Sequence, residues 1–377
     1  MLSMKKLLII VNNPAFFLSH RLNVAQEAKA QGYRVIISTM DGPAVQTIKD
    51  HGFEHLTFPM LRSGMNPLKE LKTLIALCKI YKKVKPDIVH LVTIKPVLYG
   101  GIAARLMRVP AVVYAISGMG FLFTKARSKF EPVTMITRLL YRSSLAHPNS
   151  RVIVQNQSDR ALVKEMCSLK DEQLVLIRGS GADLNRYQFL PEPAKPPIII
   201  TMAARLLKDK GVHEFVEAAR IAKKNGRNDL LWQLAGSLDA GNPTSITEED
   251  LTAWREDIRY VGEVSDIASL YSESHIVTLP SYREGLPKSL VEAAACGRAV
   301  VTTDVVGCRD AIEPGVTGLL VDVCSAESLY EGITKLADDD ELRRGMGQAG
   351  HQLACEEFDE KVIAKRQVAL YAELLDS

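Results

Sequence analysis

The chain has 377 residues, a length that predicts two domains at about 150 residues per domain. Hydrophobic residues make up 47% and charged residues 24%, which excludes a disordered chain, a collagen and a disulfide miniprotein. The net charge of +3 conceals an uneven distribution: residues 1–180 carry 26 basic and 11 acidic side chains, whereas residues 181–377 carry 21 and 33. This asymmetry indicates two domains, the first of which faces an anionic partner.

The cysteines and the N-terminus predict a cytosolic protein with reduced thiols. The six cysteines form no C-x-x-C pair and have no zinc-type spacing to a histidine. The apolar run 7–11 follows Lys5 and Lys6 but is too short for a signal peptide and predicts a buried strand. No apolar stretch approaches the ~18 residues that a membrane-spanning helix needs.

Along the first half, short apolar runs rich in β-branched residues alternate with segments of helical periodicity. Strands are expected at 6–12, 34–40, 54–60, 87–92, 111–117, 151–156 and 173–179. Helices are expected at about 20–31, 67–84, 96–107 and 158–167. Strands that are apolar throughout and separated by helices predict a parallel sheet covered on both faces.

The same alternation restarts in the second half. Strands are expected at 198–204, 230–236, 258–262, 275–280, 299–304 and 318–323, followed by a helical tail from Ser325. Between the halves, residues 189–197 contain four prolines, a composition typical of a stiff linker. We therefore predict two doubly wound, Rossmann-like α/β domains, residues 1–185 and 186–355. Ligands of such sheets lie beyond the carboxyl ends of the strands, which predicts a site in an interdomain cleft.

The first candidate site follows the strand 198–204. Arg205 and Lys210 precede Gly211 and a helix that starts near Val212. Two cations beside a helix N-terminus make an anion site, because free N–H groups and the helix dipole add to the side-chain charges. Arginine can bind a phosphate through two hydrogen bonds, and lysine acts as a point charge. The alternative is a solvated basic loop.

The second candidate site follows the strand 275–280. Glu284 is expected in the loop and Glu292 on the next helix, among alanines. Gly285 allows a close approach of the backbone to a ligand, and a carboxylate can accept two hydrogen bonds from a sugar diol. The alternative is a pair of solvated glutamates, although a carboxylate in an apolar stretch requires a partner.

Together these residues resemble a known donor site. R-x4-K-G followed by E-G-L-P-x-S-x-x-E-A-x-A-x-G is similar to the family-4 glycosyltransferases, and the resemblance covers nearly the whole chain. It implies the GT-B fold, two Rossmann-like domains with the active site between them. Residues 94–96 and 117–121 resemble the subgroup that extends polyprenyl-diphosphate-linked sugars in bacterial surface glycan assembly. Residues 177–183 resemble the interdomain crossover, and residues 356–377 the helix that crosses back to the first domain.

The resemblance also implies roles for individual residues. Arg205 and Lys210 match the diphosphate ligands, Glu292 the ribose ligand, and Glu284 the carboxylate near the transferred sugar. The remaining donor contacts implied by position are Gly262 and Glu263 at the base, and Gly285, Leu286 and Lys288 at the sugar and β-phosphate. The chain departs from the family at residues 12–15, where many members have a glycine-rich loop, and at Ser117, where many have a histidine.

Other polar residues at strand ends are candidates for the acceptor side or the cleft. These are His20, Arg21, His90, Lys95 and Ser117, and for each histidine a structural, hydrogen-bonded role is the alternative. No D-x-D motif ends a strand, and residues 338–340 are expected to start a helix, so we predict no metal and no cofactor. Arg205, Lys210 and helix dipoles can neutralise a leaving diphosphate. No G-x-S-x-G or early G-x-G-x-x-G motif supports a hydrolase or a dehydrogenase.

Two basic clusters indicate an anionic partner of the first half. Residues 62–85 hold seven cations against Glu70, and residues 121–142 hold five against Glu131, beside the apolar run 121–123. Basic helices with apolar neighbours suit an anionic membrane surface. A solvated face is the alternative, and no stacking platform supports nucleic acid.

The sequence thus predicts a retaining glycosyltransferase, peripheral on the inner face of the cytoplasmic membrane. It would move an N-acetylhexosamine or hexose from a UDP-sugar to a lipid-diphosphate-linked saccharide. The alternatives are a nucleotide-sugar epimerase or hydrolase of the same fold, and a non-catalytic scaffold that binds sugar nucleotides or membranes.

Overall fold

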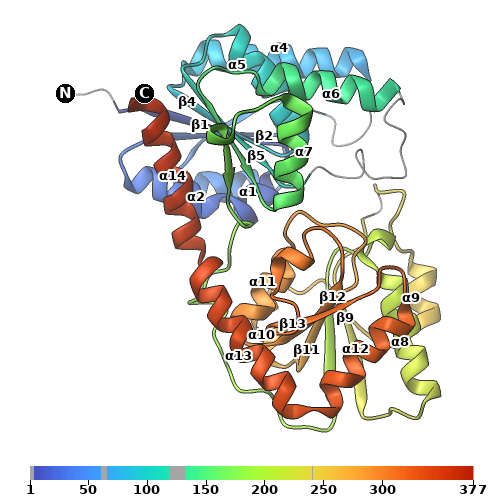
Figure 1. The fold of residues 1–377 in the computed structure, drawn as a ribbon. Helices are drawn as coiled ribbons and strands as arrows, with labels where there is room; N and C mark the ends of the chain where they lie inside the picture. Colours follow the sequence, from blue (N-terminus) through green and yellow to red (C-terminus); the bar gives the residue numbers. More distant parts are fainter. Residues whose placement is uncertain (1–3, 61–65, 119–131, 240, 377) are drawn as a thin grey trace. The chain divides into compact units, whose positions relative to one another are not determined.

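The computed structural model describes residues 4–60, 66–118, 132–239 and 241–376. The chain forms two compact units (Figure 1). Unit 1 comprises residues 1–180 and 361–377, and unit 2 comprises residues 181–360. The chain therefore leaves unit 1, forms unit 2 and returns to unit 1 with its last helix.

Unit 1 is built on a parallel sheet of seven strands. They are β1 (Lys6–Val11), β2 (Arg34–Thr39), β3 (Glu54–Thr57), β4 (Ile88–Val92), β5 (Ala111–Ile116), β6 (Ser150–Val154) and β7 (Leu174–Leu176). Their order is β3-β2-β1-β4-β5-β6-β7. Because the side chains of a strand alternate between its two faces, Leu8 and Ile10 enter one core and Leu7 and Ile9 the other. Both faces are buried, which explains strands that are apolar throughout.

Helices cover both faces of this sheet. One layer contains α1 (Pro14–His20), α2 (Leu22–Ala30), α3 (Val45–Asp50) and α14 (Glu360–Asp376). The other contains α4 (Pro67–Val84), the π-helical turn η1 (Pro96–Gly100), α5 (Gly101–Leu106), α6 (Pro132–Leu145) and α7 (Gln157–Cys167). Three helices were not among those expected from the sequence: α1, α3 and α6. The N-terminus of α1 has a clear local cause, because the Asn13 side chain caps it and Pro14 occupies its first turn.

Unit 2 has a parallel sheet of six strands. They are β8 (Ile198–Ala203), β9 (Leu230–Ala235), β10 (Arg259–Gly262), β11 (Ile276–Leu279), β12 (Ala299–Thr303) and β13 (Gly318–Val321), in the order β10-β9-β8-β11-β12-β13. The strand order reverses between β8 and β11. A ligand site is therefore expected where these two strands end.

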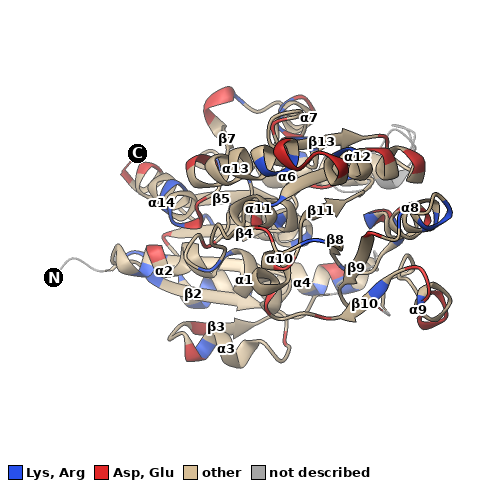
Figure 2. Ribbon diagram, turned by 90° about the horizontal axis from the view of Figure 1, so that it is seen from below, with Lys and Arg blue, Asp and Glu red and all other residues tan. Residues whose placement is uncertain are grey.

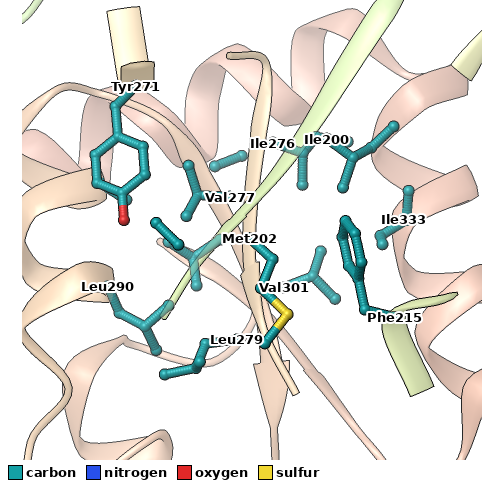
Figure 3. Close-up of a cluster of buried hydrophobic side chains, with 14 of the residues drawn as sticks. Ile200, Met202, Phe215, Tyr271, Ile276, Val277, Leu279, Leu290, Val301 and Ile333 are labelled. Carbon is teal, nitrogen blue, oxygen red and sulfur yellow. The ribbon is translucent and has the colours of Figure 1, made fainter. Parts of the chain in front are cut away.

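The helices of unit 2 enclose a single continuous core. They are α8 (Val212–Lys224), α9 (Glu248–Trp254), α10 (Ile267–Ser272), α11 (Lys288–Ala295), α12 (Ala326–Asp338) and α13 (Asp340–Glu357). Figure 3 shows Phe215 of α8 and Ile333 of α12 beside Val301 of β12, while Leu290 of α11 lies near Leu279 of β11. The core thus reaches the ends of β8 and β11 and holds the loops that follow them.

The proline-rich segment 189–197, expected as a linker, belongs to unit 2. The Glu192 carboxylate accepts two hydrogen bonds of 2.9 Å from the Arg343 guanidinium on α13. The Arg343 side chain is fully buried, so this pair fixes the segment against the helix.

Candidate active site

The loop after β8 packs closely against the residue that follows β11, Pro280. It contains Arg205 and the short turn η4 (Lys208–Lys210), and Gly211 then begins α8 with a φ of +80°. A Cβ atom on Gly211 would lie 2.0 Å from the Pro280 carbonyl oxygen, so only glycine fits. Lys210 is thereby held at the point where the strand order reverses.

Hydrogen bonds join this loop to the one that follows β11. The Tyr282 amide and the Ser281 hydroxyl both donate to the Asp209 carbonyl, at 2.9 and 3.0 Å. The Tyr282 hydroxyl donates to Glu214 on α8 at 2.7 Å. The two predicted donor motifs, distant in sequence, therefore form one fixed structure.

Lys210 and Glu284 form an ion pair between these loops. The Lys210 ammonium donates to the Glu284 carboxylate, and the two side chains are only 16% and 13% exposed. The Glu284 amide donates to the Val306 carbonyl at 3.0 Å, which fixes the backbone beside the pair. Burial and the negative charge of Glu284 raise the pKa of the nearby Cys308 thiol to about 12, so this thiol stays protonated.

Glu292 is a buried carboxylate on α11, and it has the partners that burial requires. It is 7% exposed, and its carboxylate lies 3.3 Å from the Lys288 ammonium one helical turn earlier. The Tyr187 hydroxyl also donates to it, and burial together with the charge of Glu292 raises the pKa of Tyr187. The carboxylate is thus ion-paired and hydrogen-bonded at the wall of a pocket.

Arg205 is half-exposed and pairs with Asp239, which follows β9, at 3.2 Å. The Arg205 guanidinium and the Lys210 ammonium therefore form ion pairs with different carboxylates, those of Asp239 and Glu284. Sequence reasoning missed Asp239, and the only available signal was its place after the end of a predicted strand.

A pocket of about 210 Å³ opens at the ends of β8 and β9. Its walls bring together three predicted donor residues, Arg205, Glu263 and Glu292, with Tyr271 and Ser289. Gly236, missed by the sequence analysis, has a φ of +148° and donates from its amide to the Gly262 carbonyl at 2.8 Å. Gly285 and Leu286 in the preceding loop and Lys288 at the start of α11 are partly exposed and do not line the pocket.

In unit 1, two of the predicted acceptor residues are part of the core. His90 is fully buried, and its Nδ1 atom lies 2.6 Å from the Tyr371 hydroxyl of α14. Burial, and then the charge of Arg21, hold the pKa of His90 well below its usual value. Arg21 is 2% exposed, and burial lowers its pKa to about 10. Both side chains therefore lie inside the core of unit 1 and not on its surface.

His20 lies outside this core. It is partly exposed at the end of α1, where its ring stacks on Phe16 at 4.0 Å.

The other predicted acceptor residues lie at the ends of β4 and β5. The Lys95 ammonium donates to Glu70 of α4 at 2.6 Å, and the side chains are 18% and 9% exposed. Thr93 adopts a φ of +72°, a backbone conformation that is costly for a β-branched residue. Within the part of the chain that the structure describes, the buried Thr93 and Ser117 hydroxyls have no hydrogen-bond partner. The π-helical turn η1 starts immediately afterwards, and such turns are frequent at functional sites.

Some of the predicted features lie outside the described residues. These are the motif positions Met119, Gly120 and Phe121, Arg62, and the cations Lys125, Arg127 and Lys129.

Comparison with known families decides the identity of the chain. Residues 6–156 match the family model described as "Glycosyl transferase 4-like", and residues 185–353 match "Glycosyl transferases group 1". The chain is a GT-B glycosyltransferase. Its two parallel-sheet, Rossmann-like units confirm the predicted fold class.

This glycosyltransferase resembles enzymes that are named for lipid-diphosphate acceptors. One is the N,N'-diacetylbacillosaminyl-diphospho-undecaprenol alpha-1,3-N-acetylgalactosaminyltransferase of Campylobacter jejuni, 28% identical over 95% of this chain and 98% of that protein. Another is the UDP-Gal:alpha-D-GlcNAc-diphosphoundecaprenol alpha-1,3-galactosyltransferase of Escherichia coli, 25% identical over 81% and 80%. The crystal structure of Anabaena Alr3699/HepE in complex with UDP and glucose has a TM-score of 0.76 at 18% identity and covers 98% of this chain and 100% of that one.

The relatives favour a transferase over the epimerase, hydrolase and scaffold alternatives.

In the glycosyltransferase, Asp339 caps α13 by accepting from the Leu342 amide at 2.9 Å, so the acidic run 338–340 starts a helix as predicted. Among the described residues, no group of three or more His, Cys, Asp or Glu side chains could hold a metal ion.

Proposed function

We propose that this glycosyltransferase moves a sugar, with retention of configuration, from a UDP-sugar to a saccharide linked to a lipid diphosphate in bacterial surface glycan assembly. The observation that carries the proposal is the pocket at the ends of β8 and β9, with Arg205 and Glu292 in its walls. The Lys210–Glu284 ion pair is held in the adjoining loops. UDP-linked donors and undecaprenyl-diphosphate acceptors stand in the names of similar proteins and support the substrate classes.

On the donor side, we assign the cations to the diphosphate and the carboxylates to hydroxyl groups. Arg205 and Lys210, with the positive end of the α11 dipole, would stabilise the leaving diphosphate. Glu292, which contacts Lys288 and Tyr187, would accept hydrogen bonds from the ribose. Glu284 would orient the transferred sugar, an N-acetylhexosamine or a hexose. No metal and no cofactor enters this scheme.

On the acceptor side, we assign Thr93, Lys95, Glu70 and Ser117. Among the described residues, the buried Thr93 and Ser117 hydroxyls have no hydrogen-bond partner, which is costly in a folded protein and which a polar ligand would relieve. Neighbouring strands place them together, because Val92 pairs with Ala115 in the register of β4 and β5. The enzyme would act on the cytoplasmic side of the membrane, as a peripheral protein.

A donor screen by mass spectrometry tests the proposal. UDP-hexoses and UDP-N-acetylhexosamines are supplied with and without a polyprenyl-diphosphate saccharide. We expect a mass increase of one sugar on the acceptor for one donor, and no turnover when the acceptor is absent. Conversion of a UDP-sugar without an acceptor would instead establish an epimerase or hydrolase.

The assignment of the acceptor side has its own test. Lys95→Met should raise the acceptor KM about tenfold or more, through loss of a charge-assisted hydrogen bond, and leave the donor KM unchanged. Lys361→Met on α14, the same substitution at an exposed lysine elsewhere in unit 1, is the control. A rise in donor KM alone would overturn the assignment.

A further inference from the structure

One surface of unit 1 exposes large apolar side chains. On α4 these are Leu68, Leu71 and Ile75, of which Leu68 is 73% exposed. On α5 and α6 they are Leu106, Met135, Ile136 and Leu139, of which Leu139 is 68% exposed. Packing of α5 against both α4 and α6 places the three helices in one layer on one face of the sheet (Figure 1). We call the outward side of this layer the α4–α6 surface.

The charges of the α4–α6 surface are all of one sign. Its exposed cations are Lys69, Lys72, Lys79, Lys82 and Lys83 on α4, Arg105 on α5, and Arg142 on α6. Within the described helices α4, α5 and α6 and the turn η1, the only acidic residue is Glu70, which is buried and paired with Lys95. An incoming anionic surface therefore meets cations and apolar groups without an exposed carboxylate.

The opposite layer of the same unit differs. Among the described helices α1, α2, α3 and α14, the only exposed large apolar side chain is Val362. This layer also carries acidic residues, among them Glu27, Asp50 and Glu373. In unit 2, Figure 2 shows acidic residues at the start of α9, which are Glu248, Glu249 and Asp250. Within the described helices of unit 1, the combination of exposed apolar groups and unopposed cations is thus confined to the α4–α6 surface.

We propose that the α4–α6 surface docks on an anionic membrane. The apolar side chains would enter the interface between headgroups and acyl chains, while the lysines and arginines contact lipid phosphates. Charge complementarity selects this occupant, because a patch of cations without exposed carboxylates matches an anionic bilayer. No helix among the described residues is long and apolar enough to cross a membrane, so this docking is through a surface.

The position of Glu70 links docking to the acceptor. Glu70 lies on α4 between the exposed Leu68 and Leu71, and its buried carboxylate holds Lys95 at the end of β4. The α4 segment that touches the bilayer would therefore be the segment that supports the assigned acceptor residues. This link between docking and the acceptor rests on the proposed function, since only a lipid-linked acceptor is presented at a bilayer. The docking itself can be measured without any substrate.

Vesicle sedimentation of the full chain tests the docking. Vesicles of phosphatidylcholine alone are compared with vesicles that also contain phosphatidylglycerol, at low and high salt. We expect binding that increases with phosphatidylglycerol and falls with salt. Lys72→Glu with Lys79→Glu should weaken it about tenfold or more, and Leu68→Ser with Leu71→Ser by a similar factor that persists at high salt.

The matched controls lie on α14, where Lys361→Glu with Lys365→Glu, and Val362→Ser, should leave binding unchanged. Circular dichroism checks that each variant is folded. Indifference of the wild type to phosphatidylglycerol, or equal weakening by the α14 variants, overturns the docking. Sugar transfer to a water-soluble acceptor analogue is scored separately, so loss of docking leaves the proposed reaction standing and failure of the reaction leaves docking standing.

Discussion

Two lysines at strand ends are each compensated by one glutamate. Lys95 forms an ion pair with Glu70 in unit 1, and Lys210 forms one with Glu284 in unit 2. All four side chains are mostly buried. Burial of a lone charge is expensive, and the paired carboxylate offsets it. Because a lysine ammonium has three N–H donors, Lys210 can bind a diphosphate oxygen and keep Glu284. The pair therefore holds the cation in place before the donor arrives.

Lys210→Ala and Glu292→Ala are expected to impair catalysis in different ways. Loss of Lys210 should lower kcat by about 10²–10³, because its interaction strengthens as charge develops on the leaving diphosphate. Loss of Glu292 should mainly raise the donor KM, since the ribose contact assigned to it would be equally strong in the ground and transition states. Steady-state kinetics with varied UDP-sugar separate the two, with Arg220→Ala on α8 as control. Equal losses in kcat with an unchanged donor KM would refute this division.

Sugar transfer is expected to survive chelation. The assigned neutralisation of the leaving group comes from Arg205, Lys210 and backbone amides, which EDTA does not touch. The measurement is the transfer rate in excess EDTA, with untreated enzyme as reference. Activity that disappears and returns with Mg²⁺ or Mn²⁺ would show that the diphosphate needs a metal.

The helices and strands that could be predicted from the sequence are those with a regular pattern of apolar residues. The inner strands of both sheets were predictable because they are mostly apolar runs bounded by turns, whereas the edge strands β3 and β10 are partly polar and exposed. The helix α4 was predictable because Pro67 starts an amphipathic helix. The short helices α1 and α3 were not, since neither spans enough turns to show periodicity. The π-helical turn η1 was merged with α5 into one expected helix, because its hydrogen-bond pattern leaves no sequence signal.

The positions of candidate site residues could be predicted where they depend on a single sequence motif. Glu284 in a loop and Glu292 on a helix follow from a strand, a turn and an alanine-rich run. The pairing of Lys210 with Glu284 and of Arg205 with Asp239 depends on strand order, which the sequence alone does not display. The burial of His90 could not be predicted either, because a histidine in a predicted strand gives no sign that α14 will cover it.

Gly211→Ala is expected to disable the site, whereas Gly226→Ala is not. Both glycines flank α8 with φ near +80° and +73°, a region that costs about 1–2 kcal/mol for alanine. Only at Gly211 would the new Cβ also meet a carbonyl, at 2.0 Å, so the backbone beside Lys210 must shift. Both variants should melt at lower temperature, but only Gly211→Ala should lose about 10–100-fold in kcat/KM. Equal kinetics in the two variants would contradict this.

The chain path makes unit 1 dependent on the last segment of the protein. Unit 2 is one continuous stretch, residues 181–360, whereas unit 1 is completed by residues 361–377. From α14, Ile363, Val368, Tyr371 and Leu374 enter the core beneath β1 and β4. Asn149 adds a hydrogen bond of 2.8 Å to the Leu374 carbonyl. Unit 1 can therefore finish folding only after the whole chain is present.

Truncation after Glu360 is expected to unfold unit 1 and leave unit 2 intact. Each large apolar side chain of α14 contributes roughly 1.5–3 kcal/mol by burial, so the four together match the about 5–15 kcal/mol of a typical domain. His90 would also lose its Tyr371 partner in a buried setting, which adds to the cost. Hydrogen exchange should show lost protection in β1 and β4 but not in β8 and β11, and calorimetry should still detect UDP binding. A chain truncated only after Leu375 is the control. Native protection of β4 without α14 would show that unit 1 folds on the first 180 residues alone.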